Sequence, residues 1–220
     1  MKVNEIFQSI DGEGIRTGSL VTFIRLVGCN LRCGYCDTRY AWDNSFDEHI
    51  NSTEMTPKEI VAKVNDISIG NLVTITGGEP LIHKNIYDLI ELLIQTGYEV
   101  NVETNGSIEP QRLSAPGVLF FTMDFKCPSS GEMSQMNMTA LMSLGANDVL
   151  KFVVGSLKDL DAAREIINDL GTEATIFISP VFGQIEPKQI VEYMQKYMMF
   201  PCRVQLQLHK LIWDPNMRGV

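Results

Sequence analysis

Residues 28–37 read GCNLRCGYCD and place Cys29, Cys33 and Cys36 on one short segment with C-x3-C-x2-C spacing. The segment directly follows an apolar run, Leu20–Val27, which is typical of a β-strand. Cysteine thiolates are the usual ligands of cubane iron–sulfur clusters, so three of them predict a four-iron cluster with one iron left open. Electron-transfer ferredoxins use four cysteines. The spacing therefore indicates a cluster whose open iron binds a small molecule.

A structural zinc site is the alternative for these cysteines. Such a site needs a fourth Cys or His at close spacing. The nearest histidine is His49, and the remaining cysteines are Cys127 and Cys202, which we interpret as packing residues. A zinc or iron–sulfur module without enzymatic activity stays open on this basis, and a colourless or brown protein after anaerobic reconstitution would distinguish the two metals.

Length and composition exclude several classes of protein. The 220 residues are enough for one α/β domain with a substantial core. The net charge of −9 argues against a nucleic-acid binder, which needs a basic face. The odd number of five cysteines makes a disulfide framework implausible and indicates a reducing cytoplasm. No stretch has the ~18 apolar residues of a membrane span, and the start has no apolar signal region.

Apolar strand-like runs alternate with helix-like runs along the chain. Apolar residues at helical spacing predict helices over 56–67, 86–94, 156–170 and 186–194. This alternation predicts an α/β fold with a parallel sheet. The predicted strands are Leu20–Val27, Asn71–Thr76, Tyr98–Thr104, Val118–Lys126, Asp148–Val154, Ala174–Ser179 and Arg203–Ile212.

Three polar loops follow successive predicted strands. The cysteine segment follows the first, Gly77-Gly78-Glu79-Pro80 the second and Asn105-Gly106 the third. Chemistry in such folds collects at the carboxyl ends of parallel strands, so we expect these loops at one edge of the sheet. Because side chains alternate along a strand and helices cover the outside, we expect one polar face to point inward. Its residues are Arg25, Asn101, Glu103, Asn105, Thr122, Asp124, Lys126, Gln205, Gln207 and His209.

The cysteine loop, Tyr35 before its last cysteine and the GGEP loop after the second strand together resemble the radical S-adenosylmethionine superfamily. The resemblance implies a partial (β/α) barrel of that type, modified and shortened, in a single domain 1–220. It also implies two cofactors, a [4Fe-4S] cluster and S-adenosylmethionine. Their radical chemistry would remove a hydrogen atom from the substrate.

The resemblance narrows to the 7-carboxy-7-deazaguanine synthases. The segments that carry it are FQSIDGEG at 7–14, CDT at 36–38, WD at 42–43, QLHKLIW at 207–213 and MRGV at 217–220. Members convert 6-carboxy-5,6,7,8-tetrahydropterin to 7-carboxy-7-deazaguanine with loss of ammonia, on the route to queuosine, with Mg²⁺ assisting. The resemblance further implies a homodimer, a flavodoxin or ferredoxin reductant, an N-terminal substrate segment 1–19 and a C-terminal capping tail 203–220.

The resemblance also implies roles for single residues. Cys29, Cys33 and Cys36 would hold the cluster, and Thr38 would contribute an oxygen to Mg²⁺. Contacts with S-adenosylmethionine would come from Tyr35, Cys36, Asp37, Gly78, Glu79, Asp124, Phe125, Lys126, Ser179, Pro180, Val181 and Phe182. Contacts with the pterin would come from Ile10, Asp11, Gly12, Glu13, Arg25, Thr76, His209 and the terminal carboxylate of Val220.

Several of these residues have simpler interpretations. Many members have Gln at the position of Asp11, so a side-chain amide contact is absent there. Asp124 and Lys126 could form an ion pair of purely structural value, His209 could be a core histidine, and Glu79 could hold its loop. An activase that makes a glycyl radical in a partner protein would share the cluster and the GGEP loop, but it would not need the DGEG segment or the C-terminal tail.

Overall fold

The predicted strands form one sheet in the computed structural model, which describes residues 1–43, 52–115 and 117–220. Up to residue 180, each predicted strand is present within one residue of its expected ends. The sheet has nine strands in the order β3-β1-β2-β4-β5-β6-β7-β8-β9. Their bounds are β1 Lys2–Ile10, β2 Leu20–Leu26, β3 Thr53–Glu54, β4 Leu72–Gly77, β5 Glu99–Thr104, β6 Leu119–Lys126, β7 Val149–Val154, β8 Thr175–Pro180 and β9 Arg203–Val204.

From β2 to β9 all neighbouring strands are parallel, whereas β1 is antiparallel to both β2 and β3. Because β3 and β9 are the two ends of the strand order, the sheet is an open, partial barrel. The α/β class and the partial barrel that the sequence predicts are confirmed.

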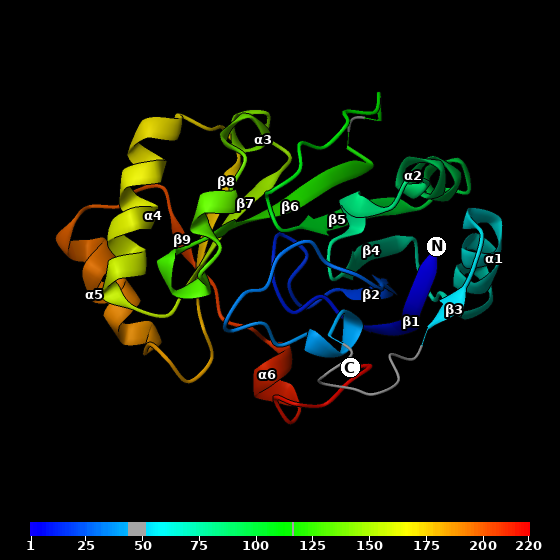
Figure 1. Ribbon diagram of the computed structural model, residues 1–220, viewed down its shortest axis with the longest axis horizontal. Coiled ribbons are helices and arrows are strands. Elements are labelled where there is room, and N and C mark those ends of the chain that lie inside the picture. Colours follow the sequence, from blue (N-terminus) through cyan, green and yellow to red (C-terminus); the bar gives the residue numbers. More distant parts are fainter. Residues whose placement is uncertain (44–51, 116) are drawn as a thin grey trace.

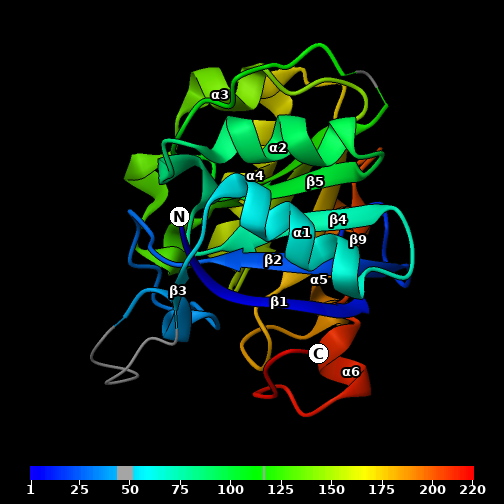
Figure 2. The same cartoon turned by 90° about the vertical axis from the view of Figure 1, so that its right-hand side faces the viewer.

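Helices cover one face of this curved sheet. In Figure 1, α1 and α2 lie outside the strands at one end, and α4 and α5 lie outside those at the other. Figure 2 shows α6 and the C-terminus on the opposite side of β1 from α1 and α2. The helices are α1 Pro57–Ile67, α2 Ile86–Gln95, α3 Met138–Met142, α4 Leu157–Leu170, α5 Pro187–Lys196 and α6 His209–Ile212, with 3-10 turns η1 Arg39–Ala41, η2 Pro80–Ile82, η3 Pro128–Ser130 and η4 Met133–Gln135. No helix of the described ranges is long and apolar enough to cross a membrane.

The hydrophobic core lies between the sheet and these helices. Alternate strand residues such as Ile75, Val102 and Phe152 are completely buried there and pack with Leu93 and Leu160 of the helices. Burying one such side chain contributes about 1.5–3 kcal/mol. Because the apolar half of each strand points outward to the helices, the polar half points to the inside of the barrel.

Strand β9 is shorter than the sequence predicts, and strand β1 was not among the predicted strands. Beyond Val204 the chain leaves the sheet, so the prediction of a strand through Ile212 is wrong, and His209 lies on α6 rather than on a strand face. The Gln205 side chain instead bonds to the backbone N–H and C=O of Gly14, at 2.7 and 2.9 Å. Long-range bonds to the segment after β1 therefore replace ladder bonds in this region.

Candidate active site

The inner face of the barrel encloses a cavity of about 650 Å³. Its walls come from β1 and the segment after it, from β2 and the cysteine loop, from β4 to β7, from the residues after β8, and from the C-terminal tail. Of the expected inward face, Arg25, Glu103, Asn105, Asp124, Lys126, Gln207 and His209 line it. Asn101 and Thr122 bond to each other at 3.0 Å in the buried interior.

All three cysteines of the loop line this cavity, and all three are free thiols. Hydrogen-bond donors lie at two of the sulfurs: Leu31 N is 3.4 Å from Cys29 Sγ, and Trp42 Nε1 is 3.3 Å from Cys36 Sγ. Burial raises the pKa of Cys29, and it raises the pKa of Cys33 to about 11. These two thiols therefore need a strong positive partner such as iron to become thiolates.

Within the described ranges, no three Cys, His, Asp or Glu side chains are grouped closely enough to hold one metal ion. A cubane differs in this respect because its cysteines bind separate irons. Neither Cys127 nor Cys202 lines the cavity, and Cys127 is completely buried in the core. His49 lies outside the described residues.

Gly77 and Gly78 bring the end of β4 against the end of β2. A Cβ on Gly77, whose φ is +141°, would overlap the backbone of Leu26, and one on Gly78 would overlap the carbonyl of Gly28. The chain approaches so closely because Gly78 N bonds to Leu26 O at 3.2 Å and Glu79 N bonds to Gly28 O at 2.8 Å. The glycine pair therefore supports the start of the cysteine loop directly.

Glu79 is fully buried and holds two loops together. Its Oε1 accepts hydrogen bonds from Leu81 N at 2.9 Å and Thr104 Oγ1 at 2.8 Å, and its Oε2 accepts one from Asn105 N at 2.6 Å. Burial raises the pKa of Glu79 to about 7, although these hydrogen bonds oppose the rise. Glu79 does not line the cavity, so the structure favours the loop-holding role over a cofactor contact.

A Glu79→Gln variant is expected to unfold more easily. The new NH2 group would face N–H and O–H donors and cannot accept from them, which costs about 2–4 kcal/mol. Urea unfolding of the protein without its cluster measures this, with the exposed Glu91→Gln on α2 as a matched control. A variant of native stability that had lost only affinity for S-adenosylmethionine would instead show direct cofactor contact.

A row of buried charges crosses the cavity wall. Lys126 Nζ lies 2.7 Å from Asp124 Oδ2, and Lys151 Nζ lies 3.2 Å from Asp124 Oδ1 and 3.1 Å from Glu13 Oε2. Both lysines hold the pKa of Asp124 below its usual value, although burial raises it. The Asp124–Lys126 ion pair expected from the sequence is therefore present, and both residues also line the cavity.

Sequence reasoning missed Lys151. A lysine in the middle of the apolar run VLKFVV, residues 149–154, is the signal that could have found it. Charged side chains are almost never fully buried unless they are paired, so such a lysine predicts buried carboxylates nearby.

Arg25, on β2, also lines the cavity. Its Nε lies 2.6 Å from Glu5 Oε1, and its guanidinium carbon lies 5.7 Å from the ring centres of both Phe7 and Tyr40. The guanidinium is thus held in one orientation at the cavity, next to Thr76 across the β2–β4 register.

Asp11, which also lines the cavity, is almost completely buried. It accepts a hydrogen bond from Thr74 Oγ1 at 3.2 Å, while burial and the charge of Glu103 raise its pKa to about 7.

The C-terminal segment closes the cavity mouth. Lys210 Nζ lies 2.6 Å from Oδ2 of the exposed Asp37, and the charge of this lysine together with the hydrogen bond from Thr38 lowers the pKa of Asp37 to about 2. The His209 ring packs so closely against Gly12 that a Cβ there would overlap it. Residues 214–220, Val220 included, also line the cavity. The C-terminal tail and the segments around Gly12 and Asp37, which are distant in the sequence, therefore lie at the same cavity.

Four residues expected at the cofactor do not line the cavity: Glu79, Phe125, Ser179 and Pro180. Phe125 points to the outer face and packs on Phe152, with ring centres 5.3 Å apart, because it alternates with Asp124 and Lys126. Ser179 and Pro180 are buried at the end of β8. The neighbouring Val181 and Phe182 do reach the cavity.

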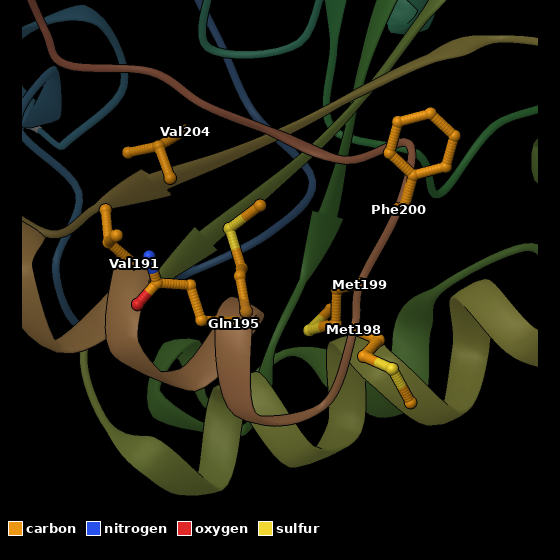
Figure 3. A pocket seen from close by; sticks show the side chains of 7 residues that line it. Val191, Gln195, Met198, Met199, Phe200 and Val204 are labelled. Atoms are coloured by element: carbon orange, nitrogen blue, oxygen red, sulfur yellow. The ribbon is translucent and has the colours of Figure 1, made fainter.

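A second, smaller hollow lies at the far end of the sheet, between α5, the loop after it and β9 (Figure 3). Its seven lining residues carry no titratable group, so it offers no chemistry comparable with the main cavity. They are Val191, Met194, Gln195, Met198, Met199, Phe200 and Val204.

Comparison with known proteins identifies the family. The model of the Radical SAM superfamily matches residues 23–130. The chain is 44% identical to the 7-carboxy-7-deazaguanine synthase of Clostridium acetobutylicum, over 100% of this chain and 99% of that protein. It is 42% identical to the synthase of Methanospirillum hungatei, over 98% of this chain and 86% of that protein. The chain belongs to the 7-carboxy-7-deazaguanine synthase family.

Solved structures agree on the fold. QueE from Escherichia coli matches with a TM-score of 0.75 and 24% identity, over 94% of both chains. Streptococcus suis SuiB, in a structure bound to S-adenosylmethionine, matches with a TM-score of 0.56 and 12% identity, over 84% of this chain and 49% of that one.

The residues of this 7-carboxy-7-deazaguanine synthase family member fit the cofactors of radical S-adenosylmethionine enzymes. Three cysteines, and only three, line the cavity within the described part of the chain. Glu13, which lines the cavity, has its Oε1 buried without a hydrogen-bond partner among the described residues. Such a group is costly unless a ligand satisfies it, so this part of the site suits a polar molecule.

Proposed function

We propose that this protein converts 6-carboxy-5,6,7,8-tetrahydropterin to 7-carboxy-7-deazaguanine with loss of ammonia, as a radical S-adenosylmethionine lyase that supplies queuosine synthesis. The observation that carries the proposal is the 44% identity to a 7-carboxy-7-deazaguanine synthase along the whole chain. The cavity with three free cysteines supports it.

The bound cluster and S-adenosylmethionine supply the radical chemistry, and the protein supplies binding and orientation. Cys29, Cys33 and Cys36 hold the cluster. The donors from Leu31 and Trp42 bond to the sulfurs, and such bonds tune the reduction potential of a cluster. We place Tyr35, Asp37, Gly78, the Asp124–Lys126 pair and the Val181–Phe182 pair against S-adenosylmethionine, because all of them line the cavity.

The pterin lies between the segment after β1 and the tail. Arg25 pairs with its carboxylate, because a guanidinium fixed by Glu5 and two rings binds such a group with defined geometry. Glu13 Oε1, which has no hydrogen-bond partner among the described residues, accepts from the N–H groups of the ring. Ile10, Asp11, Gly12, Thr76, His209 and Val220 complete this wall.

The test is anaerobic incubation of reconstituted protein with S-adenosylmethionine, a reductant and the carboxypterin. We expect the ultraviolet spectrum of a deazapurine to appear, and none when S-adenosylmethionine is omitted. A protein that carries its cluster and cleaves S-adenosylmethionine but forms no deazapurine would contradict the proposal and leave an activase as the better reading.

Magnesium is expected to raise activity through Thr38. Its Oγ1 donates to Asp37 Oδ1 at 3.0 Å at the cavity wall, so a hydroxyl and a carboxylate stand together there, and Mg²⁺ prefers oxygen ligands. We predict that Thr38→Ala flattens the response of the turnover rate to added Mg²⁺ several-fold, while Thr38→Ser and the iron content stay near native. An unchanged Mg²⁺ response in Thr38→Ala would mean that the hydroxyl serves Asp37 alone.

The finer organisation is also proposed. Segment 1–19 and tail 203–220 form the substrate side of a single domain 1–220, supported by the contacts of Gln205 and His209 with residues 12–14. A flavodoxin or ferredoxin reduces the cluster in the cytoplasm, where free thiols persist. Two copies form a homodimer, supported by the exposed Met198 and Phe200 (Figure 3), and light scattering measures this.

A further inference from the structure

Lys151 joins two carboxylates that come from distant parts of the chain. Its Nζ lies 3.1 Å from Glu13 Oε2 in the segment after β1, and 3.2 Å from Asp124 Oδ1 on β6. Only 8% of its side chain is exposed. A buried cation paired in this way ties the position of each carboxylate to the other, because breaking either contact leaves an uncompensated charge.

The two carboxylates have different neighbours in the cavity. Asp124 bonds to Lys126, and both line the cavity together with the three cysteines of the loop. Glu13 follows Gly12, whose carbonyl accepts a hydrogen bond from Leu208 N at 3.0 Å, so Glu13 stands at the C-terminal tail. Lys151 therefore lies where the cofactor side and the substrate side of the cavity meet.

We propose that Lys151 is a positioning residue that fixes Glu13, the carboxylate at the pterin, relative to the Asp124–Lys126 pair at S-adenosylmethionine. This deepens the proposed function and rests on it. With Oε2 held by Lys151, the Glu13 side chain has one orientation. Its Oε1, which is buried without a hydrogen-bond partner in the described part of the chain, is left to the substrate. A radical abstraction needs the two bound molecules in near-contact geometry, and a 1 Å error costs about 100-fold.

Lys151 acts here as a fixed charge rather than as an acid. Burial lowers its pKa, but the carboxylates of Asp124, Glu13 and Glu103 outweigh burial and hold the pKa well above its usual value. It stays protonated while the substrate is turned over.

The test compares Lys151→Met, which keeps the length and removes the charge, with Lys151→Arg. Lys188→Met is the matched control, because Lys188 is 83% exposed and, among the described residues, its ion pair is with the exposed Glu192 at 3.6 Å on α5. The first readout is the dissociation constant of oxidised 6-carboxypterin, a fluorescent analogue without hydrogen at C6, for reconstituted protein with and without S-adenosylmethionine. The second is the methionine released per product, which reports cleavage without productive transfer.

In Lys151→Met we expect the dissociation constant to rise about 30-fold or more. Methionine per product should rise about tenfold or more, because misplaced substrate lets cleavage run without conversion. Lys151→Arg should give intermediate values, and Lys188→Met native ones. Iron content and the far-ultraviolet circular dichroism spectrum should stay native in all three.

Native values of both readouts in folded Lys151→Met overturn the proposal. A second outcome also overturns it: product and methionine decrease by the same factor in Lys151→Met while the dissociation constant stays native. That result would mean only that a smaller fraction of the variant is folded. Should the Met variant not fold, a Lys151→Arg variant with native values of both readouts overturns it. If the unmodified protein does not convert the carboxypterin at all, the proposed function has failed instead.

Discussion

A Cys33→Ala variant is expected to lose the cluster and to form no deazapurine above the protein-free control. All three cysteines line the cavity, and in the proposed site each supplies one thiolate. A cubane already short of one protein ligand cannot lose a second. Iron should fall from about four atoms per chain to below one, and the brown absorbance should disappear. Cys29→Ala and Cys36→Ala should do the same. Iron analysis after anaerobic reconstitution is the measurement.

The control for this experiment is Cys127→Ala combined with Cys202→Ala. Neither cysteine lines the cavity, so iron content and turnover should stay native. Some stability is lost at Cys127 because it is completely buried in the core. Loss of iron in this double variant would show that the ligand set is wrong.

Arg25→Lys is expected to lower kcat/KM for the carboxypterin about 100-fold, mostly through KM. The lysine keeps the charge, but it cannot bond to Glu5 and to a carboxylate in the orientation that the guanidinium has between Phe7 and Tyr40. Cluster content and affinity for S-adenosylmethionine should stay native. Steady-state kinetics under anaerobic conditions measure the effect.

Two comparisons make the Arg25 experiment specific. Arg203→Lys at the exposed end of β9 is the matched control and should have native kinetics. The second comparison uses a tetrahydropterin without the carboxylate. Native protein should bind this ligand weakly. Arg25→Lys should not weaken its binding further, because the ligand lacks the carboxylate with which Arg25 is proposed to pair. Equal losses for both ligands would mean that Arg25 supports the wall without contacting the carboxylate.

Much of the fold could be predicted because the signals are local. Apolar runs of strand length, and apolar residues at helical spacing such as those over 56–67, depend on neighbouring residues alone, and the structure confirms them. Strand β1 was missed because polar residues interrupt its apolar pattern, and its pairing with β2 supplies the stability instead. The end of β9 was misplaced because Gln205 and Leu208 bond to the segment after β1, a contact between residues far apart in the sequence.

Three features of the site could be predicted from the sequence by itself. They are the cysteine spacing, the glycine pair and the inward direction of the Arg25, Glu103 and Asp124 side chains. Each follows from spacing along the chain. The spacing determines to which face of a strand a side chain points, and how many thiolates one loop offers. Only the tertiary structure decided what Glu79 and Lys151 touch. Glu79 satisfies donors of β5 and its own loop, and Lys151 joins Glu13 to Asp124. Ion pairs and buried hydrogen bonds between distant residues depend on which strands become neighbours, and no local pattern carries that information.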